Sequence, residues 1–100
     1  MVKELLNIAM NDGSRQFGDL PQSVLWYELR DHINRLEGAK VTDFITDNIT
    51  EAWIDFTYRD HRFSVNDQFG EYWFFVDDPH CPDEILEVVL GHCAVLLGSR

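Results

Sequence analysis

The spacing of hydrophobic residues divides the chain into a helical part, a run of strands and a final helix. Leucine and isoleucine recur at three- and four-residue intervals from Leu25 to Leu36, which predicts a helix over residues 21–37. Proline is tolerated in a first helical turn, so Pro21 suits the start, and Gly38 suits the end. Before this helix, residues 3–10 are predicted as a short helix and residues 11–18, which contain two glycines, as a loop.

The middle of the chain alternates with period two. Ala52, Ile54, Phe56 and Tyr58 alternate with more polar neighbours, which is typical of a half-buried strand. Residues 41–46, residues 62–66 and residues 72–76 are predicted as further strands, the last of them apolar on both faces. The connections, Arg59-Asp60-His61 and residues 66–70, are short, and short connections favour an antiparallel meander.

A wide apolar stripe predicts a helix over residues 82–97. Pro82 suits its first position, and Asp83 and Glu84 complement the positive end of the helix dipole. The stripe consists of Ile85, Leu86, Val89, Leu90, Cys93, Leu96 and Leu97. Its width indicates that most of this helix is buried.

These elements predict an α+β fold in the order (α)αβββ(β)α. We expect a two-layer sandwich in which a three- to four-stranded antiparallel meander carries the helices on one face. One hundred residues suit a single domain over 1–100, and 45% hydrophobic residues argue against disorder. Residues 1–18 form either the short helix or an N-terminal arm.

Negative charge is concentrated in one segment. Residues 41–87 contain twelve acids and two bases, Arg59 and Arg62, so they carry the whole formal net charge of −10. The same segment holds most of the aromatic residues. This charge disfavours direct nucleic-acid binding, which requires Lys and Arg to neutralise phosphates. It favours a partner with a basic or mixed surface.

Two His-Cys pairs, His80-Cys81 and His92-Cys93, resemble metal ligands. If residues 82–97 form one helix, the two cysteines lie about 18 Å apart, at ~1.5 Å per residue. That separation is too large for a shared zinc or a disulfide. We therefore expect no metal and no cofactor, and we expect two reduced thiols. Cys93 is expected to be buried, and Cys81 to have a capping or packing role, with a reactive thiol as the alternative.

No motif in the chain indicates catalysis. The serines lie in no nucleophile-elbow context, and no glycine-rich phosphate loop is present. Acidic clusters at Asp43/Asp47/Glu51 and at Asp77/Asp78 lack the spacing of a calcium loop, and we interpret them as a solvated rim. The chain shows no export signal and no apolar run long enough to cross a membrane, so we expect a cytoplasmic protein.

The second face of the sheet is the best candidate site. If Ala52 and its alternating neighbours face the helices, Trp53 and Asp55 point the other way. The strand predicted over residues 72–76 adds either Trp73 and Phe75 or Tyr72 and Phe74, depending on its register. Tryptophan is over-represented among interface anchors. The candidate binding residues are Trp53, Asp55, Trp73, Phe75, Asp77 and Asp78.

Three coverings of this face stay open: the N-terminal segment, a second copy in a homodimer, or a separate partner. We expect a small acidic, non-enzymatic protein-binding module. A nucleic-acid mimic that inhibits a DNA- or RNA-binding protein is one alternative, and it requires a row of carboxylates with phosphate-like spacing. A small hydrolase or metal-dependent enzyme is the other, and it requires a pocket with convergent polar groups.

Overall fold

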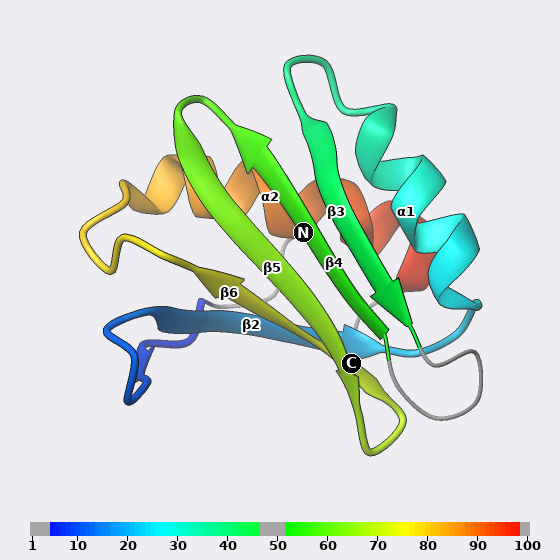
Figure 1. Cartoon of the computed structure of the whole chain (residues 1–100), viewed down its shortest axis with the longest axis horizontal. Helices are drawn as coiled ribbons and strands as arrows, with labels where there is room; N and C mark the ends of the chain where they lie inside the picture. The colour runs from blue at the N-terminus through cyan, green and yellow to red at the C-terminus, as the bar shows by residue number, and fades with distance from the viewer. Residues whose placement is uncertain (1–4, 47–51, 99–100) are drawn as a thin grey trace.

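The computed structural model describes residues 5–46 and 52–98. These residues form one antiparallel sheet and two helices in the order ββαββββα, which confirms the predicted α+β class. The elements are β1 (Ile8–Ala9), β2 (Arg15–Pro21), α1 (Trp26–Asn34), β3 (Lys40–Thr46), β4 (Ala52–Tyr58), β5 (His61–Gln68), β6 (Glu71–Val76) and α2 (Asp83–Leu97). The six strands lie in the order β1-β2-β6-β5-β4-β3 (Figure 1).

Strands β3 to β6 form the predicted meander. Both the β4–β5 and the β5–β6 connections are two-residue turns in which both residues have positive φ, at 48° and 65° for Arg59 and Asp60 and at 51° and 79° for Phe69 and Gly70. Turns with two positive φ angles match the twist of the strands that they join. They hold β4, β5 and β6 in one continuous register.

Strand β5 is longer than predicted. Its last residues, Asn66, Asp67 and Gln68, are polar, and their polarity predicts a loop. The side chains of Asn66 and Asp67 are buried and bind the start of β4 instead: the Ala52 amide donates to Asp67 Oδ1 (2.8 Å), and Asn66 Nδ2 donates to the Ala52 carbonyl (2.9 Å). Polar residues are here the hydrogen-bond partners of a buried backbone.

The N-terminal prediction was wrong, and the sheet has six strands rather than three or four. Instead of a helix over residues 3–10 and a loop over residues 11–18, the described part of this segment forms β1 and β2. A β-bulge between Gln16 and Gly18 brings both Phe17 and Gly18 toward the helices, so β2 lacks the alternation that reveals a strand.

Helix α1 is shorter than the predicted range of 21–37. Pro21 belongs to β2, and Leu25 precedes the helix in an extended conformation with a 63% exposed side chain. Leu29 and Ile33 are buried as the spacing predicted, and Leu36 packs at the margin of the core. Helix α2 begins and ends within one residue of the prediction.

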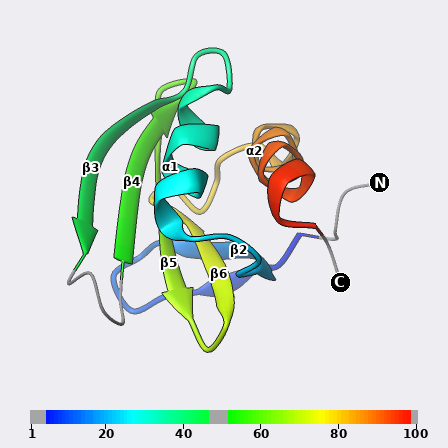
Figure 2. The same cartoon turned by 90° about the vertical axis from the view of Figure 1, so that its right-hand side faces the viewer.

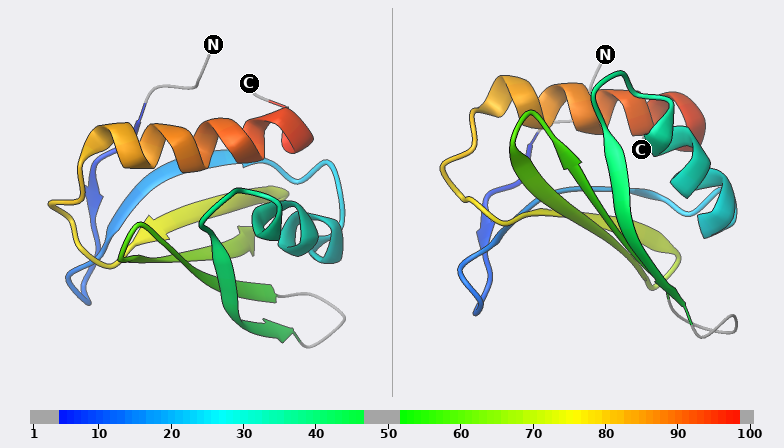
Figure 3. Two further views of the ribbon diagram at one scale, coloured as in Figure 1. Left: turned by 90° about the horizontal axis from the view of Figure 1, so that it is seen from above. Right: turned by 45° about the horizontal axis from the view of Figure 1, so that its top comes forward.

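Both helices cover the same face of the sheet (Figure 2). Helix α2 packs on β2, α1 packs on β3, and the helices contact each other (Figure 3). One core cluster joins them to the inner side chains of the strands. Helix α2 approaches β2 closely at Gly18, where an added Cβ would lie 2.7 Å from Leu90 Cδ1.

A reciprocal histidine pair joins the two helices. The rings of His32 and His92 stack with centroids 4.0 Å apart and planes 15° apart. His32 Nε2 lies 2.7 Å from the His92 carbonyl oxygen, and His92 Nε2 lies 2.6 Å from the His32 carbonyl oxygen. Because a carbonyl only accepts, each Nε2 carries a proton and donates.

Candidate functional site

The face of the sheet turned away from the helices, called the outer face below, is the candidate site. Strand register places its side chains in three rows that run across the strands. The first row is Ile45, Trp53, Asn66, Trp73 and Asp19; the second is Asp43, Asp55, Ser64, Phe75 and Gln16; the third is Lys40, Thr57 and Arg62. The open register question is resolved, because Tyr72 and Phe74 are buried toward the helices and Trp73 and Phe75 share the face of Trp53.

Aromatic side chains occupy one side of this face. Trp53 of β4 is 37% exposed, and its ring lies 6.1 Å from that of Phe75 of β6, across the intervening strand β5. Trp73 lies 6.4 Å from Phe69, whose side chain is 92% exposed at the tip of the β5–β6 turn. Exposed apolar surface gathered in this way is typical of interaction sites.

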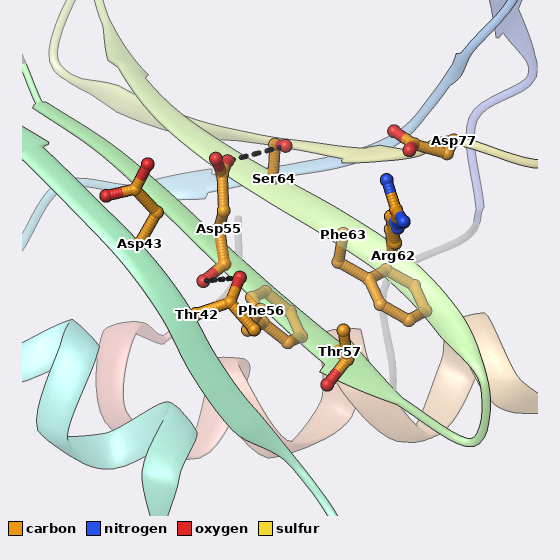
Figure 4. Close-up of a pocket in the computed structure, with 9 residues that line it drawn as sticks. All are labelled: Thr42, Asp43, Asp55, Phe56, Thr57, Arg62, Phe63, Ser64 and Asp77. Carbon is orange, nitrogen blue, oxygen red and sulfur yellow. Dashed lines mark hydrogen bonds between the residues drawn. The ribbon is translucent and has the colours of Figure 1, made fainter.

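A groove of about 530 Å³ lies over β3, β4 and β5 (Figure 4). Asp43 and Asp55 are directly opposite each other on neighbouring strands. Ser64 donates to Asp55 Oδ1 (2.8 Å), and the Phe44 amide donates to Asp43 Oδ1 (2.9 Å). Each carboxylate therefore has one oxygen engaged by a local donor.

The far end of the groove carries a base, Arg62, and a third acid, Asp77. Arg62 points toward Asp77, which directly follows β6 (Figure 4), and the Asp77 amide donates to the Arg62 carbonyl (3.0 Å). Ser64 and Asp77 also line a smaller hollow of about 140 Å³. That hollow lies next to the groove and is lined further by Met10, Asp12, Ser14, Trp53 and Phe75.

The structure brings most of the predicted site residues together. Trp53, Asp55, Phe75 and Asp77 line the groove or the hollow, and Trp73 occupies the neighbouring row. Asp78 lies apart from them: its Oδ1 accepts from the His80 amide (2.9 Å) and its carbonyl from the Cys81 amide (3.0 Å), so it shapes the turn before α2.

Residues 5–18 do not cover the outer face, because β1 and β2 extend the sheet sideways. Only the turn between them reaches its rim, where Asp12 Oδ1 accepts from the amide (3.0 Å) and the hydroxyl (2.6 Å) of Ser14. These bonds hold the pKa of Asp12 below its ordinary value, so it stays an anion beside the hollow.

One edge strand of the sheet is short, and the other is protected. At one edge, β1 has two residues. At the other, α1 packs beside β3, where the Val41 amide donates to Asn34 Oδ1 (3.0 Å) and Arg30 lies over the Phe44 ring at 4.9 Å. A β-bulge between Val41 and Asp43 also interrupts this edge strand. Such features hinder the addition of a further strand.

The two cysteines are buried free thiols on the helical side. Burial raises the pKa of Cys81, and the neighbouring Asp78 raises it further; burial alone raises the pKa of Cys93 to about 12. Within residues 5–46 and 52–98 no group of three or more His, Cys, Asp and Glu side chains could hold a metal ion. Asp47 and Glu51 of the predicted acidic cluster lie outside the described residues.

Sequence reasoning left several lining residues out of the site. Thr42 and Asp43 lie at a bulge, and their alignment with Asp55 depends on strand pairing. The sequence pattern predicts a helix that ends at Met10 and a loop that contains Asp12 and Ser14. No sequence pattern marks Phe69 as an exposed aromatic residue of the site, because the polar residues around it predict an ordinary connection between two strands.

Neither described helix is long and apolar enough to cross a membrane. Comparison of the chain with protein-family models, with curated proteins and with solved structures gives no match.

Proposed function

We propose that the protein is a non-enzymatic binding module, acting in the cytoplasm, that uses its outer face to hold a protein with a basic or mixed surface. The observation that supports this most directly is the register of β3, β4, β5 and β6. It gathers Trp53, Phe75, Asp43 and Asp55 on one open face while the helices cover the other. Buried aromatic anchors with charges around them are the usual composition of a protein interface.

The acid pair supports a binding role because it opposes folding. Like charges directly opposite each other across two strands destabilise a sheet by about 0.2–1 kcal/mol. Neither Asp43 nor Asp55 has a salt bridge among the described residues. Residues whose interactions oppose folding are expected at functional surfaces.

The two alternatives receive less support. In the second row the carboxylates of Asp43 and Asp55 are followed by Ser64 and Phe75, so this row is not the line of acids that a nucleic-acid mimic requires. No histidine or cysteine lines the groove or the hollow among the described residues, so Ser64 has no base of the kind that activates a serine nucleophile. A second copy of the same face would bring acid against acid.

The test is capture of partners from the source lysate by the immobilised protein, read by mass spectrometry. We expect a partner that is retained by the native protein and lost from a variant carrying Trp53→Ser and Asp55→Asn. The matched control carries Val95→Ser and Glu87→Gln on the exposed side of α2, and it should retain the partner. Capture that the outer-face changes leave intact would contradict the proposal.

Charge also sets the expected kinetics. Carboxylates at the rim steer a basic surface toward the face, so the association rate of the captured partner should fall as salt rises. Surface plasmon resonance at low and physiological ionic strength measures this rate. An association rate independent of salt would remove the steering role of Asp43, Asp55 and Asp77.

A further inference from the structure

We infer that the occupant of the outer face is a basic peptide segment in an extended conformation. One arginine side chain lies between Asp43 and Asp55, and an apolar side chain three positions away enters the hollow beside Trp53 and Phe75. This inference rests on the proposed function and adds the chemistry of the partner. It is carried by the charge, the aromatic pair and the spacing of the two subsites.

Charge complementarity assigns the cation. Two carboxylates face each other across β3 and β4, and the bases nearest in the rows of the outer face, Lys40 and Arg62, lie in the next row rather than between them. Opposite positions on paired strands have Cβ atoms about 4.5–5.5 Å apart. A planar guanidinium inserted there can donate to both carboxylates, which removes their repulsion.

The aromatic pair assigns the second side chain. Trp53 lies two residues before Asp55 on the same strand, so both point to the same side. Its ring and that of Phe75, tilted by 31°, form the apolar lining of the hollow of about 140 Å³ together with Met10, and its polar lining consists of Asp12, Ser14, Ser64 and Asp77. This space suits one side chain rather than a whole helix, and an apolar side chain can pack there against the two rings.

The distance between the two subsites favours an extended segment. The acid pair lies between β3 and β4, and the hollow lies over β5 and β6, which is about two strand spacings away, or roughly 10 Å at ~4.8 Å each. In a polyproline II segment, side chains three residues apart point the same way and are separated by about 9.3 Å at ~3.1 Å per residue. The protected edges of the sheet leave strand addition as the weaker mode of binding.

Synthetic peptides test the inference on the intact protein. One peptide carries an arginine and a leucine three positions apart in a proline-containing segment; a second replaces arginine with citrulline, which has the same shape without charge. Binding is followed by the backbone amides of Asp43 and Asp55 and by the Trp53 indole in nuclear magnetic resonance spectra. We expect the arginine peptide to perturb these signals and to bind at least about tenfold more tightly than the citrulline peptide.

Matched variants locate the contact. The pair Asp43→Asn and Asp55→Asn should abolish the preference for arginine, while the pair Glu84→Gln and Glu87→Gln, which removes the same charge from α2, should preserve it. Equal affinity for arginine and citrulline, or equal effects of the two variant pairs, would overturn the inference.

The outcome also separates this inference from the proposed function. If no peptide perturbs the outer face while partner capture still depends on Trp53, the arginine subsite is wrong and the binding face stands. If capture is independent of the outer face, the proposed function fails first, whatever the peptides do.

Discussion

Gly18 lies where β2 meets Leu90 of α2. An added Cβ would lie 2.7 and 2.9 Å from the two terminal methyl carbons of Leu90, which is fully buried, so the Leu90 side chain would have to shift within the core. We expect Gly18→Ala to lower the free energy of unfolding by about 1–3 kcal/mol, the usual cost of overpacking. Urea unfolding measures this change.

Its control removes the obstacle. Leu90→Val replaces the two Cδ methyl carbons with Cγ methyl carbons one bond nearer the helix backbone, at a cost of its own of roughly 1 kcal/mol. The double variant Gly18→Ala/Leu90→Val should therefore be more stable than the sum of the single changes predicts. Additive losses would show that the contact with Leu90 is not the cause.

The two thiols should be slow to react. Because burial raises the pKa of Cys81 and sets that of Cys93 at about 12, little thiolate forms at neutral pH. We expect iodoacetamide to modify Cys81 more slowly than free cysteine and Cys93 more slowly still, as read by mass spectrometry. Modification of Cys81 faster than free cysteine would indicate an activated thiol instead.

The same shift gives a pH dependence of stability. The ordinary pKa of a cysteine thiol is 9.0. Above about pH 9, Cys93 therefore loses its proton in the unfolded chain but keeps it in the folded protein. The unfolded state then binds fewer protons, so stability falls as pH rises from 9 toward about 12. Cys93→Ala should reduce the fall in the free energy of unfolding between pH 9 and about 12. An unchanged fall would show that other groups cause it.

At the scale of elements, the histidine pair is a specific tie between α1 and α2. Each ring donates one hydrogen bond to the partner helix, and such bonds contribute about 0.5–1.5 kcal/mol each. His32→Ala and His92→Ala should each lower the free energy of unfolding by about 0.5–1.5 kcal/mol, measured by urea unfolding, because each removes the ring that donates to a carbonyl of the other helix. Losses near zero for both variants would mean that neither hydrogen bond persists in solution.

The elements also show what a sequence can reveal. Strand β4 and helix α2 were predicted closely because each has one buried face, and burial imposes a clear period on the residues. Strand β2 was missed because its bulge places adjacent residues on one side, and because Pro21 resembles a helix start. The end of β5 was missed because Asn66 and Asp67 satisfy a buried backbone, which composition alone does not show.

The candidate site was likewise predictable only in part. Alternation within β4 correctly separated Trp53 and Asp55 from the core. Which residues join them depends on register between strands, so Asp43 and the choice between Trp73 and Tyr72 required the structure. Asp78 was included by proximity in sequence, although the turn before α2 directs it elsewhere.

At the scale of the molecule, the net charge of −10 acts against compactness. Salt screens repulsion between exposed charges more than about 8–10 Å apart. We therefore expect the melting temperature, measured by circular dichroism, to rise modestly from low to physiological ionic strength. A fall on adding sodium chloride would show that favourable ion pairs outweigh the repulsion.

The protected borders of the sheet have a consequence for the protein at high concentration. Exposed rings such as those of Trp53 and Phe69 would favour fibril growth if neighbouring molecules could also pair their backbones. A two-residue strand on one side and a bulged, helix-covered strand on the other hinder that pairing. The borders of the sheet therefore limit fibril growth even though aromatic rings are exposed on its outer face.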